Sequence, residues 1–252
     1  MSTRARVVRT AVAIAGLLAL ALACAFLSVW QYRRAAESRA ITARFAAAAE
    51  EPALDEAPPE LTDDVRFRRL AVAGRYLPEP QFLLDNRVRD GAAGYDVLTA
   101  FELRDGRTLL VNRGWVEANP DRGVLPDVQI DADERTVRGQ LDRLPRAGLR
   151  LGASFPAAAA REPVIVVVSP NAAEIGARLH ARLLDYVLAL GSGEPDSFAR
   201  DAEPPVLSPE RHLAYAGQWV LFALGAVGAA VAIARSARPV RTADRSGAWG
   251  WG

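Results

Sequence analysis

The nine residues RHLAYAGQW, at positions 211–219, bring together side chains that could bind a flat apolar ligand or a metal-bearing cofactor. At about 100° per residue, four side chains of this region share an arc of about 80° on a helix: those of His212, Tyr215, Trp219 and Phe222. A neutral imidazole can ligate haem iron, and aromatic rings can shield the macrocycle. The alternative interpretation is an aromatic belt at a membrane boundary with a solvated histidine.

The opposite side of the same helix carries small residues: Gly217, Gly225, Gly228 and Ala232. Small residues let helix backbones approach closely inside a membrane. We therefore expect this side to pack against another span or against a partner helix.

A second distinctive group lies in the β-rich sequence LLVNRGWV: Asn112, Arg113, Gly114 and Trp115. One interpretation is structural, with the glycine relieving crowding, the tryptophan filling a core or an interface, and the polar side chains bonding neighbouring groups. The other interpretation is a partner-binding surface formed by these four residues.

Enzyme signatures are missing from the sequence. Cys24 is the only cysteine, and His180 and His212 are the only histidines. These counts exclude a disulfide framework and a protein-only zinc or copper site with three or four nitrogen and sulfur ligands. Neither a glycine-rich phosphate loop nor a His-Glu-x-x-His sequence occurs. A membrane-tethered hydrolase would need His180 close to a nucleophile such as Ser169 or Ser192.

Two apolar segments, 11–32 and 212–234, are the elements that must position these residues. Each contains an uncharged run long enough, at about 1.5 Å per residue, to cross a hydrocarbon core of about 30 Å. Aromatic residues mark one end of each segment, with Trp30 in the first and Trp219 in the second. A signal peptide is the alternative for the first segment, but its apolar run is longer than a typical signal core and no Ala-x-Ala site follows it directly.

Charge places the two ends of the chain. Arginines flank the first segment within residues 1–10 and the second within residues 235–252, which predicts that both of these ends are cytoplasmic. Long loops translocate largely regardless of charge, so residues 33–211 are predicted to form a periplasmic domain. All 31 basic residues are arginine, which is typical of a GC-rich bacterial genome, and the net charge of +1 gives no argument for nucleic-acid binding.

The loop between the spans predicts an antiparallel, β-rich α+β domain. Residues 33–60 have the composition of a polar, alanine-rich connection, and strand-like runs begin near Val65. Two β-rich runs meet at Asp105-Gly106, which predicts a hairpin with a two-residue turn. One short helix is expected after Asn171, which would cap it. Because strands precede and outnumber this helix, the fold class is α+β, with two transmembrane helices flanking the domain.

The sequence resembles the surfeit-locus cytochrome c oxidase assembly protein family over almost the whole chain. The resemblance rests on three motifs in the same order relative to the two spans: Gly94 and Tyr95, then Asn112 to Trp115, then His212, Leu213, Tyr215, Ala216, Gln218 and Trp219. Each motif alone is weak, but their order and spacing are specific.

This resemblance implies a membrane-anchored assembly factor that catalyses no reaction itself. It implies that the protein binds haem a transiently and helps to insert it into the catalytic subunit of a haem-copper oxidase, with the haem a synthase as a second candidate partner. His212 is the implied iron ligand, flanked by Tyr215 and Trp219, and Arg211 is expected to pair with a propionate on charge alone. The rival hypothesis is a membrane scaffold that stabilises an oxidase intermediate without touching haem.

Overall fold

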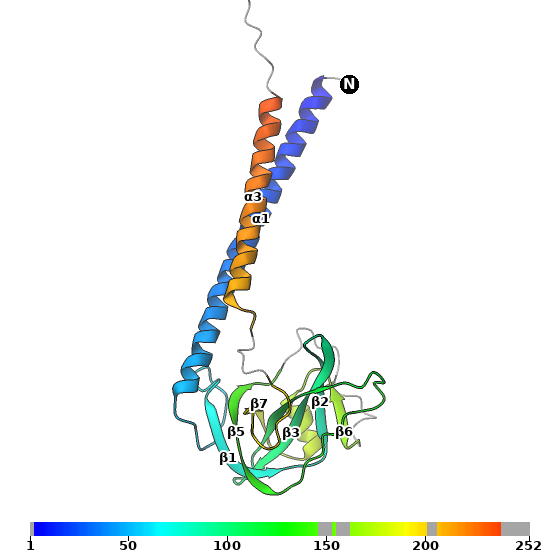
Figure 1. Ribbon diagram of the computed structural model, residues 1–252. Helices are drawn as coiled ribbons and strands as arrows, with labels where there is room; N and C mark the ends of the chain where they lie inside the picture. Colours follow the sequence, from blue (N-terminus) through cyan, green and yellow to red (C-terminus); the bar gives the residue numbers. More distant parts are fainter. Residues whose placement is uncertain (1–2, 146–152, 155–161, 201–205, 238–252) are drawn as a thin grey trace, which may run out of the picture. The chain divides into compact units, whose positions relative to one another are not determined.

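The computed structural model describes residues 3–145, 153–154, 162–200 and 206–237 (Figure 1). The chain divides into two compact units. The helical unit comprises Met1–Thr42 and Pro205–Gly252, and the strand unit comprises Ala43–Pro204. Each unit is described separately below.

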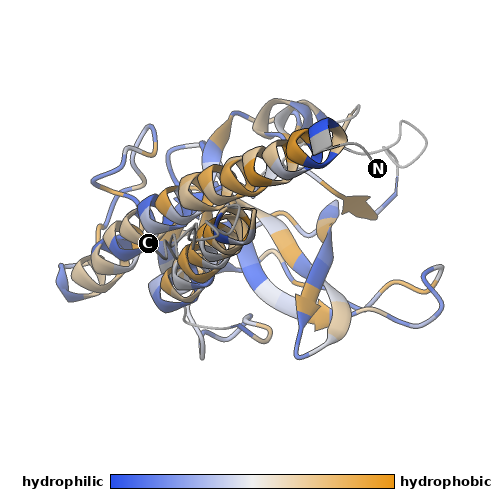
Figure 2. Cartoon of the chain, turned by 90° about the horizontal axis from the view of Figure 1, so that it is seen from above, coloured by the Kyte–Doolittle hydropathy of each residue, from blue (hydrophilic) through white to orange (hydrophobic). Residues whose placement is uncertain are grey.

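The helical unit contains α1 (Thr3–Glu50), whose last residues enter the strand unit, and α3 (Pro209–Ser236). Both helices are long and apolar enough to cross a membrane, and Figure 2 shows hydrophobic residues along much of each. Helix α1 continues well beyond the predicted span, through residues 33–50, where we expected a polar, alanine-rich connection. These residues are rich in alanine and contain no glycine or proline, and the helix ends just before Pro52.

The strand unit contains seven strands and one short helix among its described residues. In chain order these are β1 (Arg69–Tyr76), β2 (Gln81–Arg89), β3 (Ala92–Leu103), β4 (Thr108–Glu117), β5 (Glu134–Arg143), β6 (Val164–Val167), α2 (Ala172–Leu179) and β7 (Leu183–Leu190). The strand order is β1-β5-β7-β4-β3-β2-β6, and β1 also pairs with β3. Five strands therefore close into a barrel, and β2 and β6 extend the sheet from β3.

The sheet is mixed, so the expectation of a purely antiparallel domain is corrected. Strands β2 and β6 pair in parallel, and so do β4 and β7, while the other pairs are antiparallel. The connection from β2 to β6 runs through β3, β4 and β5, and the connection from β4 to β7 runs through β5, β6 and α2, so neither parallel pair is joined by a short turn. Parallel neighbours need such crossover connections, and local sequence patterns do not reveal which strands a crossover will join.

The two Asp-Gly pairs of the chain lie in the turns of two hairpins, and the two turns have different backbone conformations. In the predicted β3–β4 hairpin, residues 104–107 lie outside the strands and only Gly106 has a positive φ, of 81°. The two-residue turn occurs instead in the β2–β3 hairpin, where Asp90 and Gly91 have φ angles of 50° and 82°. Two successive positive φ angles are the signature of a type I′ turn.

Apolar side chains pack on both faces of the sheet. Alternate residues of β1, β3, β4, β5 and β7, including Tyr76, Phe101 and Tyr186, form one cluster inside the barrel. Residues of opposite orientation on β2, β3, β4 and β7 pack under α2 through Ile175. As predicted, α2 is capped by Asn171, whose Oδ1 accepts a hydrogen bond from the Glu174 amide at 3.0 Å.

Candidate functional site

The predicted cofactor residues lie in the first turns of α3. The helix begins with Pro209, whose missing N–H costs nothing at this position. Arg211 is exposed and Tyr215 is 53% exposed, whereas His212 and Trp219 are half-buried. The ring of Trp219 lies edge-on to that of Phe222, with centroids 5.8 Å apart. The structure therefore holds these aromatic side chains on one side of α3, as the helical arc predicted.

The side chain of His212 contacts α1 through one hydrogen bond. Its Nδ1 lies 2.8 Å from Oε1 of Gln31. With the carbonyl oxygen of Gln31 facing the ring, Nδ1 of a neutral imidazole would be the donor of this hydrogen bond. Among the described residues, the other ring nitrogen, Nε2, makes no hydrogen bond. In that tautomer, the free lone pair of His212 would lie on Nε2.

Polar residues of α1 also bind the backbone of the α3 segment. Ser28 donates a hydrogen bond from Oγ to the carbonyl oxygen of Ala216 at 3.1 Å. Ser38 does the same to the carbonyl oxygen of Leu207 at 2.6 Å. The three contacts run in opposite directions along the two helices, so the pair is antiparallel. Gln31 lies between the two serines, which fixes it opposite His212.

On each helix, one set of the less exposed residues recurs at alternating spacings of three and four. On α1 they are Ile14, Leu17, Ala21, Cys24, Ser28, Gln31, Ala35 and Ser38, and on α3 they are His212, Ala216, Trp219, Ala223, Ala226, Ala230 and Ile233. This repeat of 3.5 residues is that of a coiled-coil seam. His212 and Trp219 therefore belong to the face that packs on α1.

The predicted packing of the glycine face against the other span is wrong. Gly217, Gly225 and Gly228 are exposed, and a Cβ atom added to any of them would meet nothing within 4 Å. The face of α3 that lies against α1 is its alanine face, which contains Ala216, Ala223, Ala226 and Ala230. The Ala216 carbonyl oxygen on this face binds Ser28, and the neighbouring His212 side chain binds Gln31. Alanine is also small enough for close approach and favours the helix more than glycine does. Packing of the glycine face against a partner helix stays a prediction.

The motif from Asn112 to Trp115 is built into the strand unit. Asn112 is 9% exposed and Arg113 is 5% exposed. The guanidinium of Arg113 donates from Nε to the Asp196 carbonyl oxygen at 3.0 Å and from Nη1 to the Val128 carbonyl oxygen at 2.8 Å. It also lies over the ring of Phe198, with Cζ 4.7 Å from the centroid. One buried cation thus joins β4 to two separate loops.

Burial sets the electrostatics of this motif. It lowers the pKa of Arg113, and the nearby Asp196 carboxylate partly offsets the effect. Arg200 donates to the Asn112 carbonyl oxygen at 3.0 Å, and burial lowers its pKa as well. The guanidiniums of Arg113 and Arg200 therefore donate hydrogen bonds to backbone carbonyl groups inside the domain.

Gly114 allows a loop to pair with β4. Its φ is +119°, and an added Cβ would lie 2.7 Å from the carbonyl oxygen of Phe198. On either side of it, the Phe198 amide donates to the Arg113 carbonyl oxygen at 2.6 Å and the Trp115 amide donates to the Ala199 carbonyl oxygen at 2.7 Å. A glycine is required here because the loop backbone occupies the space of a side chain.

Trp115 is the half-buried member of the motif. Its ring packs against Gly94, where an added Cβ would overlap the indole. The indole Nε1 donates to the Arg87 carbonyl oxygen at 3.4 Å, and Arg87 forms an ion pair with Asp96 at 2.7 Å. Only Trp115 of the four predicted partner-binding residues thus has accessible surface of any size, and its binding to a partner stays a prediction.

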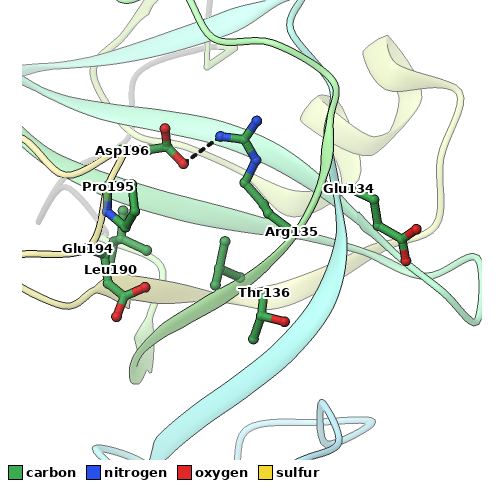
Figure 3. A pocket seen from close by; sticks show the side chains of 8 residues that line it. Glu134, Arg135, Thr136, Leu190, Glu194, Pro195 and Asp196 are labelled. Atoms are coloured by element: carbon green, nitrogen blue, oxygen red, sulfur yellow. Dashed lines mark hydrogen bonds and ion pairs between the residues drawn. The ribbon is translucent and has the colours of Figure 1, made fainter.

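A cavity of about 180 Å³ lies beside β5 in the strand unit (Figure 3). Arg135 points across it to Asp196, with Nη1 2.8 Å from Oδ2, and Arg135 also pairs with Asp131. Its guanidinium lies over the ring of Tyr76, whose buried hydroxyl has a raised pKa because burial disfavours the phenolate. The ion pair between Arg135 and Asp196 therefore forms part of the cavity wall.

Sequence comparison decides the family. The SURF1 family profile matches residues 18–224, a range that includes the Asn112 to Trp115 motif and His212. The chain belongs to the SURF1 family. Members of this family generally act as oxidase assembly factors rather than enzymes, and two candidate membrane helices fit a membrane protein.

Several SURF1-like proteins are similar to this chain. An uncharacterized SURF1-like protein of Mycobacterium bovis is 28% identical over 166 residues, which are 64% of this chain and 57% of that protein. A SURF1-like protein of Rickettsia felis is 30% identical over 113 residues, 44% of this chain and 49% of that protein. One from Dictyostelium discoideum is 39% identical over 54 residues, 21% of this chain and 20% of that protein. The alignments thus cover between 20% and 57% of the length of these relatives.

The residues at the start of α3 in this SURF1 family member fit a haem group on donor chemistry. The described residues contain no group of three or more His, Cys, Asp or Glu side chains that could hold a metal ion. Haem iron carries four ligands of its own in the macrocycle and takes further donors from side chains such as histidine. The Nε2 atom of His212 is such a donor, and the exposed ring of Tyr215 lies on the same side of α3.

Sequence reasoning missed Gln31. The sequence places it one residue after Trp30, at the end of the first apolar segment, where a polar residue is unremarkable. Its partner His212 lies 181 residues further along the chain, and the two residues meet only because α1 and α3 pair antiparallel. The seam spacing of Ser28, Gln31 and Ser38 was the available signal, because polar residues at three, seven and ten positions apart share one helix face.

Proposed function

We propose that this protein is a membrane-anchored carrier that binds haem a and assists its insertion into the catalytic subunit of a haem-copper oxidase. The observation that carries the proposal is the contact between Nδ1 of His212 and Gln31 at one end of an apolar helix pair. This contact leaves Nε2 of His212 available to a ligand. Membership of the SURF1 family supports the oxidase as the client. The protein itself catalyses no reaction in this proposal.

Each predicted residue has a role in binding. The Nε2 atom of His212 donates its lone pair to the iron, which haem supplies when it is bound. The exposed Tyr215 and the half-buried Trp219 offer ring surface to the macrocycle. Arg211 is exposed next to the histidine, so its guanidinium can pair with a propionate in the polar boundary region.

The location of the domain follows from the arginines. With both ends of the chain in the cytoplasm, residues 33–211 lie in the periplasm of a bacterial inner membrane, and haem is handed over at the outer boundary. Reporter fusions test this arrangement. A phosphatase that is active only in the periplasm should be active when inserted near Gly193 and inactive when fused after Gly252, and the reverse pattern would contradict it.

Haem content tests the carrier function. The full chain is coexpressed with haem a synthesis enzymes, purified in detergent, and analysed by pyridine haemochrome spectra. We expect haem a on the parent protein and its loss from His212→Ala. The matched control is His180→Asn, because His180 is the other histidine, is exposed, and has a left-handed φ of 51° that asparagine tolerates. Haem on neither the parent nor the control would contradict the proposal.

The second candidate function is a scaffold that holds an oxidase intermediate without binding haem. The exposed glycine face of α3 favours it, since nothing in the described residues lies where side chains at Gly217, Gly225 or Gly228 would point. Gly225→Leu separates the two functions. A scaffold should lose the copurified catalytic subunit with this variant, whereas a carrier should keep its haem content.

A further inference from the structure

We infer that Gln31 is a positioning residue for His212: it fixes the imidazole in the form with the proton on Nδ1 and keeps Nε2 free to bind. The inference rests on the proposed haem site and deepens it. It adds to that site a residue from α1, which the arc of α3 side chains alone does not contain.

The first argument is the geometry of the contact. Oε1 of Gln31 lies 2.8 Å from Nδ1 of His212, which is a good hydrogen-bond length. Free neutral histidine favours the form with its proton on Nε2, and in this form Nε2 has no free lone pair for a metal. An acceptor at Nδ1 reverses this preference, and it also restricts rotation of the ring.

The second argument is the rigidity of the support. Gln31 lies on the seam between Ser28 and Ser38, and both serines are hydrogen-bonded to carbonyl oxygens of the α3 segment. The neighbouring seam residue Ala35 is fully buried. The amide therefore cannot slide along α3 without breaking these bonds, so its acceptor stays aligned with the imidazole.

The third argument is the choice of an amide rather than a carboxylate. A neutral acceptor at the edge of an apolar helix pair avoids the cost of burying a charge. It also withdraws the Nδ1 proton less strongly than a carboxylate, so the imidazole is a weaker iron ligand. A carrier that must release its cargo benefits from such a moderate ligand.

The test compares Gln31→Glu, Gln31→Met and the control Ser28→Ala, all in the full chain. Glutamate keeps an acceptor at this position and makes it stronger. Methionine has a side chain of similar length but removes the carbonyl acceptor. Ser28→Ala removes another hydrogen bond of the same seam without touching His212. The readouts are haem affinity, the reduction potential, the ferrous iron–histidine stretching frequency, and the rate of haem transfer to excess apomyoglobin.

We expect Gln31→Met to bind haem about tenfold more weakly, as is typical when the acceptor behind a metal-bound histidine is lost. It should also raise the potential, lower the stretching frequency and speed transfer. Gln31→Glu should change all four quantities in the opposite direction, and Ser28→Ala should leave the potential and the frequency unchanged. Equal spectra and potentials in all variants would overturn the inference, as would the same shift in Ser28→Ala.

A measurement without haem separates this inference from the proposed function. The chain has only two histidines, so nitrogen-15 spectra of histidine-labelled protein give two assignable rings, with His180 as an internal reference. We expect neutral His212 to carry its proton on Nδ1 in the parent and to move toward the Nε2 form in Gln31→Met. If the parent binds no haem, the carrier function fails; if the proton position does not respond to Gln31→Met, the positioning role fails.

Discussion

Nη1 of Arg113 donates a hydrogen bond of 2.8 Å to the carbonyl oxygen of Val128, fifteen residues further along the chain. The same guanidinium bonds the Asp196 carbonyl oxygen and covers Phe198, so a single side chain fastens two loops to β4. This arrangement makes the motif around Arg113 a structural element of the domain as well as a candidate binding surface.

Replacement of Arg113 should therefore cost stability. A lysine cannot serve both carbonyl oxygens in the same geometry and does not stack on the Phe198 ring, so we expect Arg113→Lys to lower the free energy of unfolding by about 2 kcal/mol. Urea unfolding in detergent measures this. The control Arg104→Lys changes an exposed ion pair with Glu134 and should stay within about 0.5 kcal/mol. Similar losses in both variants would contradict the role of Arg113.

The backbone at Gly114 should reject any side chain. Gly114→Ala combines a φ of +119° with an approach of 2.7 Å to the Phe198 carbonyl oxygen, so we expect a loss of about 3 kcal/mol or more. Gly106 also has a positive φ, of 81°, but open space around it, and Gly106→Ala should cost only about 1 kcal/mol. Thermal unfolding of both variants gives the comparison, and the reverse order would refute the close approach of the loop.

The domain should lose stability at high pH partly through Tyr186. Burial raises the pKa of Tyr186 to about 12, and its hydroxyl donates to the Pro58 carbonyl oxygen at 2.7 Å. A raised folded-state pKa favours the protonated form, so this contribution is complete below about pH 10 and is lost as the pH rises toward about 12. The difference in the free energy of unfolding between the parent and Tyr186→Phe should therefore become smaller as the pH rises through this range. A constant difference would rule out this linkage.

The exposed part of Trp115 should bind the oxidase. Trp115→Ala is expected to reduce the copurified catalytic subunit severalfold, because a half-buried indole offers the large amphipathic contact that interfaces favour. Haem content should not change. Val168→Ala, at an exposed position beyond β6, serves as the control and should retain the subunit. Retention of the subunit by both variants would leave the motif with its structural role alone.

Local chemistry made the apolar helices, the strands and the arc of aromatic side chains on α3 predictable. Uncharged runs of sufficient length mark the two apolar helices, and a β-branched run marks the strand β6. The aromatic arc with His212 follows from helical periodicity alone, because residues on one helix keep their angular positions in any fold.

The sequence by itself determined which segments are apolar, which are strands, and that His212 shares a helix side with aromatic rings, because these properties depend on residues close together in the chain. Only the tertiary structure decided the parallel pairing of β4 with β7, the burial of Arg113, the choice of the alanine face of α3, and the contact of His212 with Gln31. Each of these joins segments far apart in sequence, and the partner is selected by shape and by the need to satisfy polar groups that local patterns do not specify.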